Sequence, residues 1–141
     1  MMDPSLPELL RLTEPERELL KLAWDMLAAI HSGDFEFYAA HCTPDLSCYE
    51  DVCPYRIDGL EFHLDMIRVL GSDPSTFPVR FDLLTPRVQL LGDTGVVTFT
   101  RLTSRQSNGV PHWSTCNETR VFTRSDGTWK MAHFHRSGVP G

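Results

Sequence analysis

Three arginines lie inside predicted β-strands whose other residues are mostly apolar or uncharged. Arg101 occurs in VVTFTRLT, Arg120 in NETRVF and Arg136 in HFHR. A guanidinium does not readily lose its proton, so a buried arginine needs an anionic or carbonyl partner. If the three strands are antiparallel neighbours, the guanidiniums can converge and bind a carboxylate through paired N–H donors. This pattern favours an anion pocket lined by arginine.

Carboxylates of the same chain are the alternative partners for these arginines, and spacing alone leaves both interpretations open. The internal candidates are Glu118, Glu50 and Asp58, and an arginine at a strand end would instead lie in water. The same three carboxylates are also weakly supported candidates for a catalytic acid or base. The chain has no G-x-S-x-G motif, no phosphate-binding glycine loop and no protein-kinase motif. We therefore predict no catalytic residues.

Two histidines at His-x-His spacing near the end of the chain raise the question of a metal site. Alternation along a predicted strand places four side chains on one face: Trp129, Met131, His133 and His135. The opposite face then carries three: Ala132, Phe134 and Arg136. A metal would need a third ligand, for which His112 or Cys116 is the candidate. Packing is the better interpretation because the histidines share their face with two large apolar side chains, so we predict no metal ligand.

The first half of the chain has helical periodicity. It predicts three helices, over about 14–32, 35–41 and 60–70. Thr13 and Glu16 form a capping-box pattern, and Pro15 fits the first turn of the first helix. His63 lies on the third helix, and it can face the arginine pocket if that helix covers the concave side of the sheet. Residues 1–12 are expected to be a flexible lead-in.

From Phe77 onward the period changes to two, which predicts β-structure. The strand candidates are 79–84, 87–91, 95–104, 112–123 and 129–136, separated by Pro86 and by glycine-containing turns. Helices followed by a meander of long strands indicate an α+β fold. Val96, Val97 and Phe99 make one strand apolar on both faces, and too few residues remain to cover both. We therefore expect self-association.

Composition limits the classes of protein that this chain can belong to. A chain of 141 residues is expected to form one domain, and a net charge of −6 argues against non-specific nucleic-acid binding. No stretch is apolar for the roughly 20 residues that a membrane helix needs. The acidic start, MMDPSLPELL, does not resemble a signal peptide. The four cysteines, Cys42, Cys48, Cys53 and Cys116, form no C-x2-C pair, so we expect reduced thiols in a cytoplasmic protein.

A collinear set of motifs from Leu19 to Pro140 resembles the association (hub) domain of calcium/calmodulin-dependent protein kinase II. The motifs are IHSGDFEFYAAHCTPDL, YE, DGLEFH, LTPRVQLLGD, FTRLTSRQ, NETRVFTRSDGTWK and HFHRSGVPG. A single motif of this set would not indicate the family, but the order and spacing of all of them are specific to it. The resemblance places the hub domain over residues 13–141.

The resemblance implies a cone-shaped curved antiparallel sheet around a long N-terminal helix, the nuclear-transport-factor-2-like (NTF2-like) or SnoaL-like fold. It also implies a homo-oligomer in which dimers close into two stacked rings of about a dozen or more subunits. It implies a pocket for a small carboxylate or an acidic peptide. Five positions of this sequence match that pocket: Arg101, Arg120, Arg136, His63 and Tyr38. No cofactor, membrane or nucleic acid is implied.

Two departures from the family pattern accompany the resemblance. Gly71 occurs where the family often has a tryptophan near the pocket mouth, and the stretch EDVCPYRIDG differs from the family's usual loop. We expect a non-catalytic oligomerisation hub. The alternative is a small SnoaL-like isomerase, cyclase or hydratase that uses the same pocket, although three guanidiniums would depress the basicity of any carboxylate base there.

Overall fold

The long N-terminal helix begins and ends as the sequence predicts. The computed structural model describes residues 11–51, 53–71 and 79–138, so nearly all of the predicted lead-in lies outside the described residues. Helix α2 spans Glu14–Ser32, and its first turn has the capping box, in which Thr13 accepts from the Glu16 N–H and Glu16 accepts from the Thr13 N–H. Gly33 ends the helix with φ 81°, a left-handed conformation that suits glycine.

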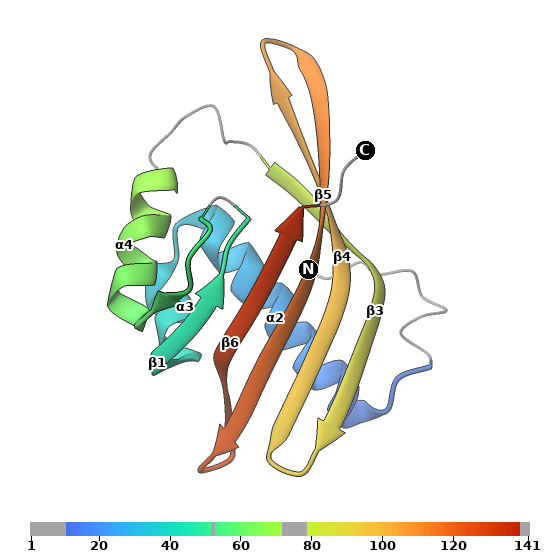
Figure 1. Ribbon diagram of the computed structural model, residues 1–141. Helices are drawn as coiled ribbons and strands as arrows, with labels where there is room; N and C mark the ends of the chain where they lie inside the picture. The colour runs from blue at the N-terminus through green and yellow to red at the C-terminus, as the bar shows by residue number, and fades with distance from the viewer. Residues whose placement is uncertain (1–10, 52, 72–78, 139–141) are drawn as a thin grey trace.

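Two shorter helices follow. Helix α3 spans Phe35–Ala40, and Asp34 caps it by accepting a hydrogen bond from the Phe37 N–H at 3.1 Å. Helix α4 spans Leu60–Gly71 and lies beside strand β1, Cys42–Tyr49, at one end of the sheet (Figure 1). Both helices confirm the prediction, and together they bring Tyr38 and His63 close to each other.

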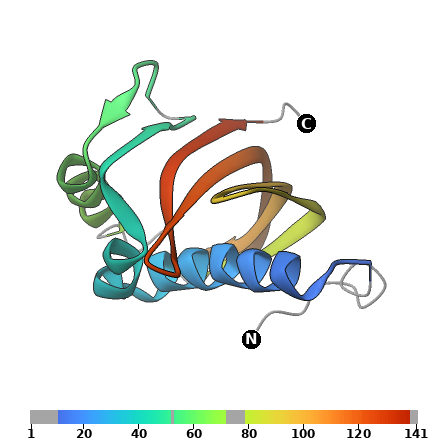
Figure 2. The same cartoon turned by 90° about the horizontal axis from the view of Figure 1, so that it is seen from below.

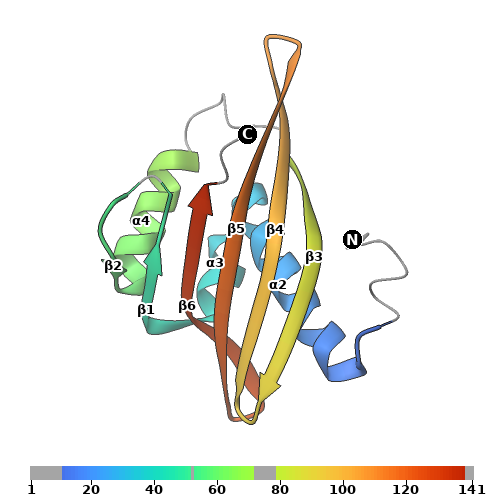
Figure 3. The ribbon, with the colours of Figure 1, turned by 45° about the vertical axis from the view of Figure 1, so that its right-hand side comes forward.

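The strands form one six-stranded sheet in the order β2-β1-β6-β5-β4-β3 (Figure 3). The remaining bounds are β2 Ile57–Asp58, β3 Val79–Leu91, β4 Thr94–Ser107, β5 Val110–Ser125 and β6 Thr128–Gly138. Strands β3 to β6 are an antiparallel meander, as predicted. Strand β1 instead pairs parallel with β6, because the chain returns to the sheet after α2 and α3. This topology places the last strand in the interior of the sheet.

The predicted break at Pro86 is wrong, because β3 continues through it. The register between β3 and β4 shifts between Leu84 and Arg87, and Thr85 has a positive φ of 47°. Proline donates no backbone hydrogen bond, so it is tolerated in a sheet at a bulge or on an edge strand. Strand β3 is an edge strand, and it has a bulge at this point.

The predicted faces of the last strand are also wrong in their second half. Met131 is paired with Phe122 and His133 with Val121, so Ala132 is an extra residue in β6. Such a bulge reverses the side-chain alternation that follows it. Met131 and Phe134 are consequently both buried, 0% and 2% exposed, while His135 is exposed. The two histidines therefore lie on the outer face, and Arg136 shares the inner face with Phe134.

The core lies between α2 and the concave face of the curved sheet, which arches over the helix (Figure 2). Leu19, Ala23 and Met26 on α2 are fully buried against it. Strand β4 approaches the helix so closely that a Cβ atom at Gly95 would lie 2.3 Å from Leu19 Cδ2. Among the described residues, no helix combines the length and apolar character needed to cross a membrane.

Candidate functional site

A buried carboxylate joins two of the three strand arginines. Glu118 on β5 is 2% exposed, Arg120 on the same face of β5 is 2% exposed and Arg101 on neighbouring β4 is 6% exposed. Arg120 donates to Glu118 Oε1 through Nη2 at 2.6 Å and Nε at 3.2 Å. Arg101 Nε lies 2.8 Å from the other oxygen, Oε2. One buried anion thus serves two buried cations.

The third arginine has its own carboxylates. Arg136 on β6 forms a hydrogen-bonded ion pair with Glu50, which is 7% exposed and follows strand β1. Its Nε lies 3.3 Å from the more exposed Asp51. The three guanidiniums are therefore matched by Glu118, Glu50 and Asp51, and the cluster is close to neutral. Of the two interpretations left open by the sequence, pairing with Glu118 and Glu50 is confirmed, whereas Asp58 pairs with exposed Arg56 at 2.7 Å.

Tyr38 and His63 form a second, uncharged part of the cluster. The Tyr38 hydroxyl is 2.9 Å from His63 Nε2, and His63 Nδ1 is 3.8 Å from Cys48 Sγ. All three residues are 1% exposed or less. Phe134 connects this part to the arginines, because its ring lies 5.2 Å from the His63 ring and 4.9 Å from the Arg120 guanidinium carbon. The five residues predicted for the pocket therefore gather in one region.

Burial and charge set the protonation states in the cluster. Burial opposes charge on Glu118, but Arg120 and Arg101 outweigh it and hold the pKa of Glu118 below its ordinary value. Burial raises the pKa of Glu50 above its ordinary value in spite of Arg136. Burial, reinforced by Arg120 and Arg136, lowers the pKa of His63 to about 4. His63 is therefore neutral at physiological pH, so it is not one of the cations of the cluster.

His31, in the last turn of α2, is a member of the site that the sequence analysis missed. Burial, followed by the positive charges of Arg101 and Arg136, lowers its pKa to about 4. Among the described residues, three buried nitrogens make no hydrogen bond of good geometry: Arg101 Nε and Arg136 Nε, which nevertheless lie near the carboxylates of Glu118 and Asp51, and His31 Nε2. Only the position of His31 on the buried side of the predicted helix could have indicated it. The site thus has well-directed hydrogen bonds around Arg120, and ion pairs with poorly directed Nε donors at Arg101 and Arg136.

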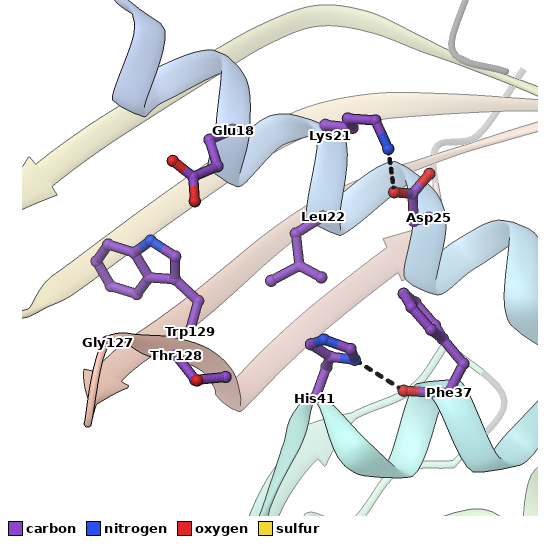
Figure 4. A pocket seen from close by; sticks show the side chains of 9 residues that line it. All are labelled: Glu18, Lys21, Leu22, Asp25, Phe37, His41, Gly127, Thr128 and Trp129. Atoms are coloured by element: carbon purple, nitrogen blue, oxygen red, sulfur yellow. Dashed lines mark hydrogen bonds and ion pairs between the residues drawn. The ribbon is translucent and has the colours of Figure 1, made fainter.

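A separate surface groove lies between α2, α3 and the β5–β6 turn (Figure 4). Its volume is about 360 Å³, and its lining is Glu18, Lys21, Leu22, Asp25, Phe37, His41, Gly127, Thr128 and Trp129. The polar groups in it already bind one another, with Lys21 Nζ 2.6 Å from Asp25 and His41 Nδ1 2.9 Å from the Phe37 carbonyl. The groove therefore offers fewer unused polar groups than the buried cluster.

The fold and the buried cluster define a small α+β protein of the NTF2-like class. An NTF2-like protein of unknown function from Pseudomonas putida KT2440 superimposes with a TM-score of 0.77 over 89% of this chain and 87% of that chain. The two sequences are 18% identical, so this similarity concerns the fold alone. The predicted fold class is confirmed.

The chain belongs to the calcium/calmodulin-dependent protein kinase II association domain family, whose model matches residues 15–140. The delta subunit of that kinase from Oryctolagus cuniculus is 35% identical over 128 residues, which are 89% of this chain and 24% of the subunit. The chain therefore spans about a quarter of that relative. The S. rosetta hub of the same kinase has a TM-score of 0.80 at 30% identity, covering 91% of this chain and 99% of that one. The family resemblance seen in the sequence is confirmed.

Proposed function

We propose that this chain is a non-catalytic oligomerisation hub, in which dimers close into two stacked rings and the arginine cluster binds a small carboxylate or an acidic peptide. Membership of an association-domain family supports the self-association. The four cysteines are free thiols, which fits the cytoplasmic setting that we expect. Assembly and ligand binding rest on different surfaces, so they can be tested separately.

The outer face of the sheet is the observation that best supports assembly. Outward positions of β4, β5 and β6 form rows across the strands: Val96, Thr98, Thr100, Leu102, Thr115, Asn117, Thr119, Val121, His133, His135 and Ser137. None of these residues is Asp, Glu, Lys or Arg, and the charged outward residues of the described sheet border them, with Lys130 on β6 and Arg80, Asp82 and Arg87 on β3. A sheet face that stays in water normally carries charged side chains, whereas the core of an interface is depleted in them. This face therefore suits a second copy of the chain.

Mass measurement tests the assembly. Sedimentation velocity and light scattering should give one particle with the mass of about a dozen or more subunits, independent of protein concentration over the micromolar range. A monomer or an isolated dimer would contradict the hub. A ring of a different subunit number would retain the hub and correct only its size, because small changes in the angle between subunits alter closure.

Two poorly directed donors of the arginine cluster support ligand binding. Arg101 Nε and Arg136 Nε lie near Glu118 and Asp51 but make no hydrogen bond of good geometry, so an anion that accepts from them in line is bound favourably. His31 Nε2 can add a third hydrogen bond when that nitrogen carries the proton. Because Arg120 is the arginine that makes well-directed hydrogen bonds to Glu118, the ligand's principal contacts shift from Arg120 toward Arg101 and Arg136. Thermal stabilisation by acetate or butyrate, relative to equal ionic strength of chloride, is the direct test.

The enzymatic alternative has less support in the geometry. An isomerase or hydratase needs an available base near its substrate, and Glu50, whose pKa burial raises, is the best candidate. Arg136 holds that carboxylate in an ion pair. Glu118 is held by two guanidiniums, which makes it a weak base. The described residues therefore favour a binding site over a proton-transfer site.

A further inference from the structure

We infer that Cys48, Glu50 and His63 form a binding site for one zinc-like transition-metal ion. Their ligand atoms, a sulfur, a carboxylate oxygen and an imidazole nitrogen, all lie within 4.8 Å of one another. Each side chain is buried, with exposed fractions of 0%, 7% and 1%. Cys48 and Glu50 are two residues apart in an extended segment and point inward, whereas Tyr49 between them is 36% exposed. His63 approaches the same point from helix α4.

The ligand set selects the class of metal. Sulfur, nitrogen and one carboxylate oxygen suit zinc and its neighbours Co²⁺ and Fe²⁺, whereas Mg²⁺ and Ca²⁺ prefer oxygen alone. Zinc bonds of 2.3 Å to sulfur and 2.0–2.1 Å to nitrogen place tetrahedral ligands about 3.5 Å apart. Cys48 Sγ and His63 Nδ1 are already 3.8 Å apart. Only small side-chain movements are needed to close the site, and the fourth position is left to water or an anion.

Tyr38 gives His63 the orientation that a ligand histidine needs. Metal-bound histidines usually hold their second ring nitrogen in a hydrogen bond, which fixes the tautomer and the ring direction. Here Nε2 is 2.9 Å from the Tyr38 hydroxyl, which turns Nδ1 toward Cys48. When the metal binds Nδ1, the ring proton resides on Nε2 and is donated to the Tyr38 oxygen.

Charge balance shows how a cation is accommodated beside the arginines. Coordination displaces the Cys48 thiol proton to solvent, so zinc, thiolate and the Glu50 carboxylate together are neutral. Arg136 binds Oε2 of Glu50, and the same carboxylate has a second oxygen for the metal. Arg120 is neutralised by Glu118. Relative to the metal-free site, with a Cys48 thiol and a Glu50 carboxylate, this exchange adds one positive charge, which an anion in the fourth position would offset.

The metal site shares His63 with the predicted pocket and Glu50 with the Arg136 ion pair, but none of the three arginines is a metal ligand, so metal content and carboxylate affinity can be measured separately. It also gives a role to Glu50, the first residue of the stretch EDVCPYRIDG that departs from the family pattern. A metal bound here would connect α4 to β1, because Cys48 lies in β1, Glu50 directly follows it and His63 lies on α4.

Metal analysis of the chain, stripped with a chelator, reloaded with Zn²⁺ and dialysed, tests the site. We expect about one zinc per chain, falling to background in Cys48→Ser and in His63→Gln. Cys116→Ser is the matched control, because Cys116 is another buried thiol that lies beside Glu118 instead. The double variant His133→Asn, His135→Asn should also keep its zinc. Zinc retained by Cys48→Ser, or lost from the histidine double variant, would overturn the inference.

The Co²⁺-loaded protein gives a second test that needs no folded variant. A thiolate ligand produces a sulfur-to-cobalt charge-transfer band in the near ultraviolet, and four-coordination produces intense visible bands. Both should appear in the unmutated chain and in Cys116→Ser, with one proton released per ion bound. A spectrum of octahedral cobalt without the charge-transfer band would exclude Cys48 as a ligand.

Discussion

Glu118 and Arg120 form an ion pair whose side chains are 0% and 3% exposed, at 2.6 Å. The pair is more than a local contact, because the second oxygen of Glu118 also lies near Arg101 on the neighbouring strand. Two buried cations thus depend on a single anion. Arg101 Nε reaches Glu118 without good hydrogen-bond geometry, so this shared carboxylate links the stability of the fold to the ligand site.

Glu118→Gln should destabilise the protein strongly. Removing one partner of a buried ion pair leaves an uncompensated charge, which costs about 3–5 kcal/mol. The matched control is Asp58→Asn, which removes the exposed ion pair with Arg56 and should cost less than about 1 kcal/mol. Urea unfolding at fixed protein concentration measures both values. Equal, small losses would show that Glu118 does not neutralise the arginines.

Local signals made most of the fold predictable. The capping box of Thr13 and Glu16 places the first helix within a residue, and glycine-containing turns separate β4, β5 and β6 correctly. The errors arise where one residue changes the register. Neither the bulge at Ala132 nor the passage of β3 through Pro86 has a reliable local signal, because each is stabilised by pairing with a neighbouring strand.

The sequence predicted which residues gather at the site, but not which carboxylate pairs with which arginine. The positions of Arg101, Arg120 and Arg136 came from motif and alternation, and the structure gathers them. Which carboxylate each one meets depends on strand register, so Glu118 and Glu50 remained alternatives in the sequence. His31 and the triad around Cys48 depend on contacts between distant segments, which no spacing rule reveals.

Arg101→Gln should reduce the affinity for small carboxylates about tenfold or more. A charge-assisted hydrogen bond contributes about 1.5–3 kcal/mol, and Arg101 Nε is a buried donor that makes no hydrogen bond of good geometry to nearby Glu118. Arg105→Gln is the control, because it makes the same change at an exposed position of the same strand. Calorimetric titration with butyrate measures both affinities, and sedimentation confirms that the particle is intact. Equal affinity in the two variants would place the ligand elsewhere.

The free energy of unfolding should fall between pH 6.5 and pH 4, and His31 should contribute to the fall. In the unfolded chain a histidine takes up a proton below about pH 6.5, whereas the folded protein keeps the pKa of His31 at about 4. The unfolded state therefore binds more protons in this range, and acidification favours it by up to about 1.4 kcal/mol per pH unit.

His31→Asn tests this assignment, because asparagine does not titrate. The variant should show a shallower loss of stability between pH 6.5 and pH 4 when urea unfolding is repeated across the range. The remaining slope includes His63, whose pKa is also lowered to about 4. A chelator in all samples keeps metal away from His63. An unchanged slope would show that His31 is already accessible to protons in the folded state.

Gly95→Ala should destabilise the fold by about 1–3 kcal/mol, because the new methyl group would overlap Leu19. The added Cβ would lie 2.3 Å from Leu19 Cδ2, with the Trp129 ring at 3.6 Å. Leu19 is 0% exposed and has little room to move. The control is Gly138→Ala, where the new Cβ meets nothing within 4 Å. The midpoint temperature of thermal unfolding should be clearly lower for Gly95→Ala than for Gly138→Ala. Similar midpoints would mean that α2 can shift away from the sheet.

Thr119→Glu should reduce the mass of the assembled particle. Thr119 lies in the centre of the outer face, where the neighbouring positions are uncharged, opposite Thr98 on one side and His135 on the other. A carboxylate buried there on association would lose its water without gaining a cationic partner among the uncharged neighbours, which weakens the interface. Lys21→Gln changes the net charge by the same amount on the exposed side of α2 and should leave the mass unchanged. Sedimentation velocity distinguishes the two. If Thr119→Glu assembles like the unmutated chain while Lys21→Gln does not, the interface lies on the helical side of the protein.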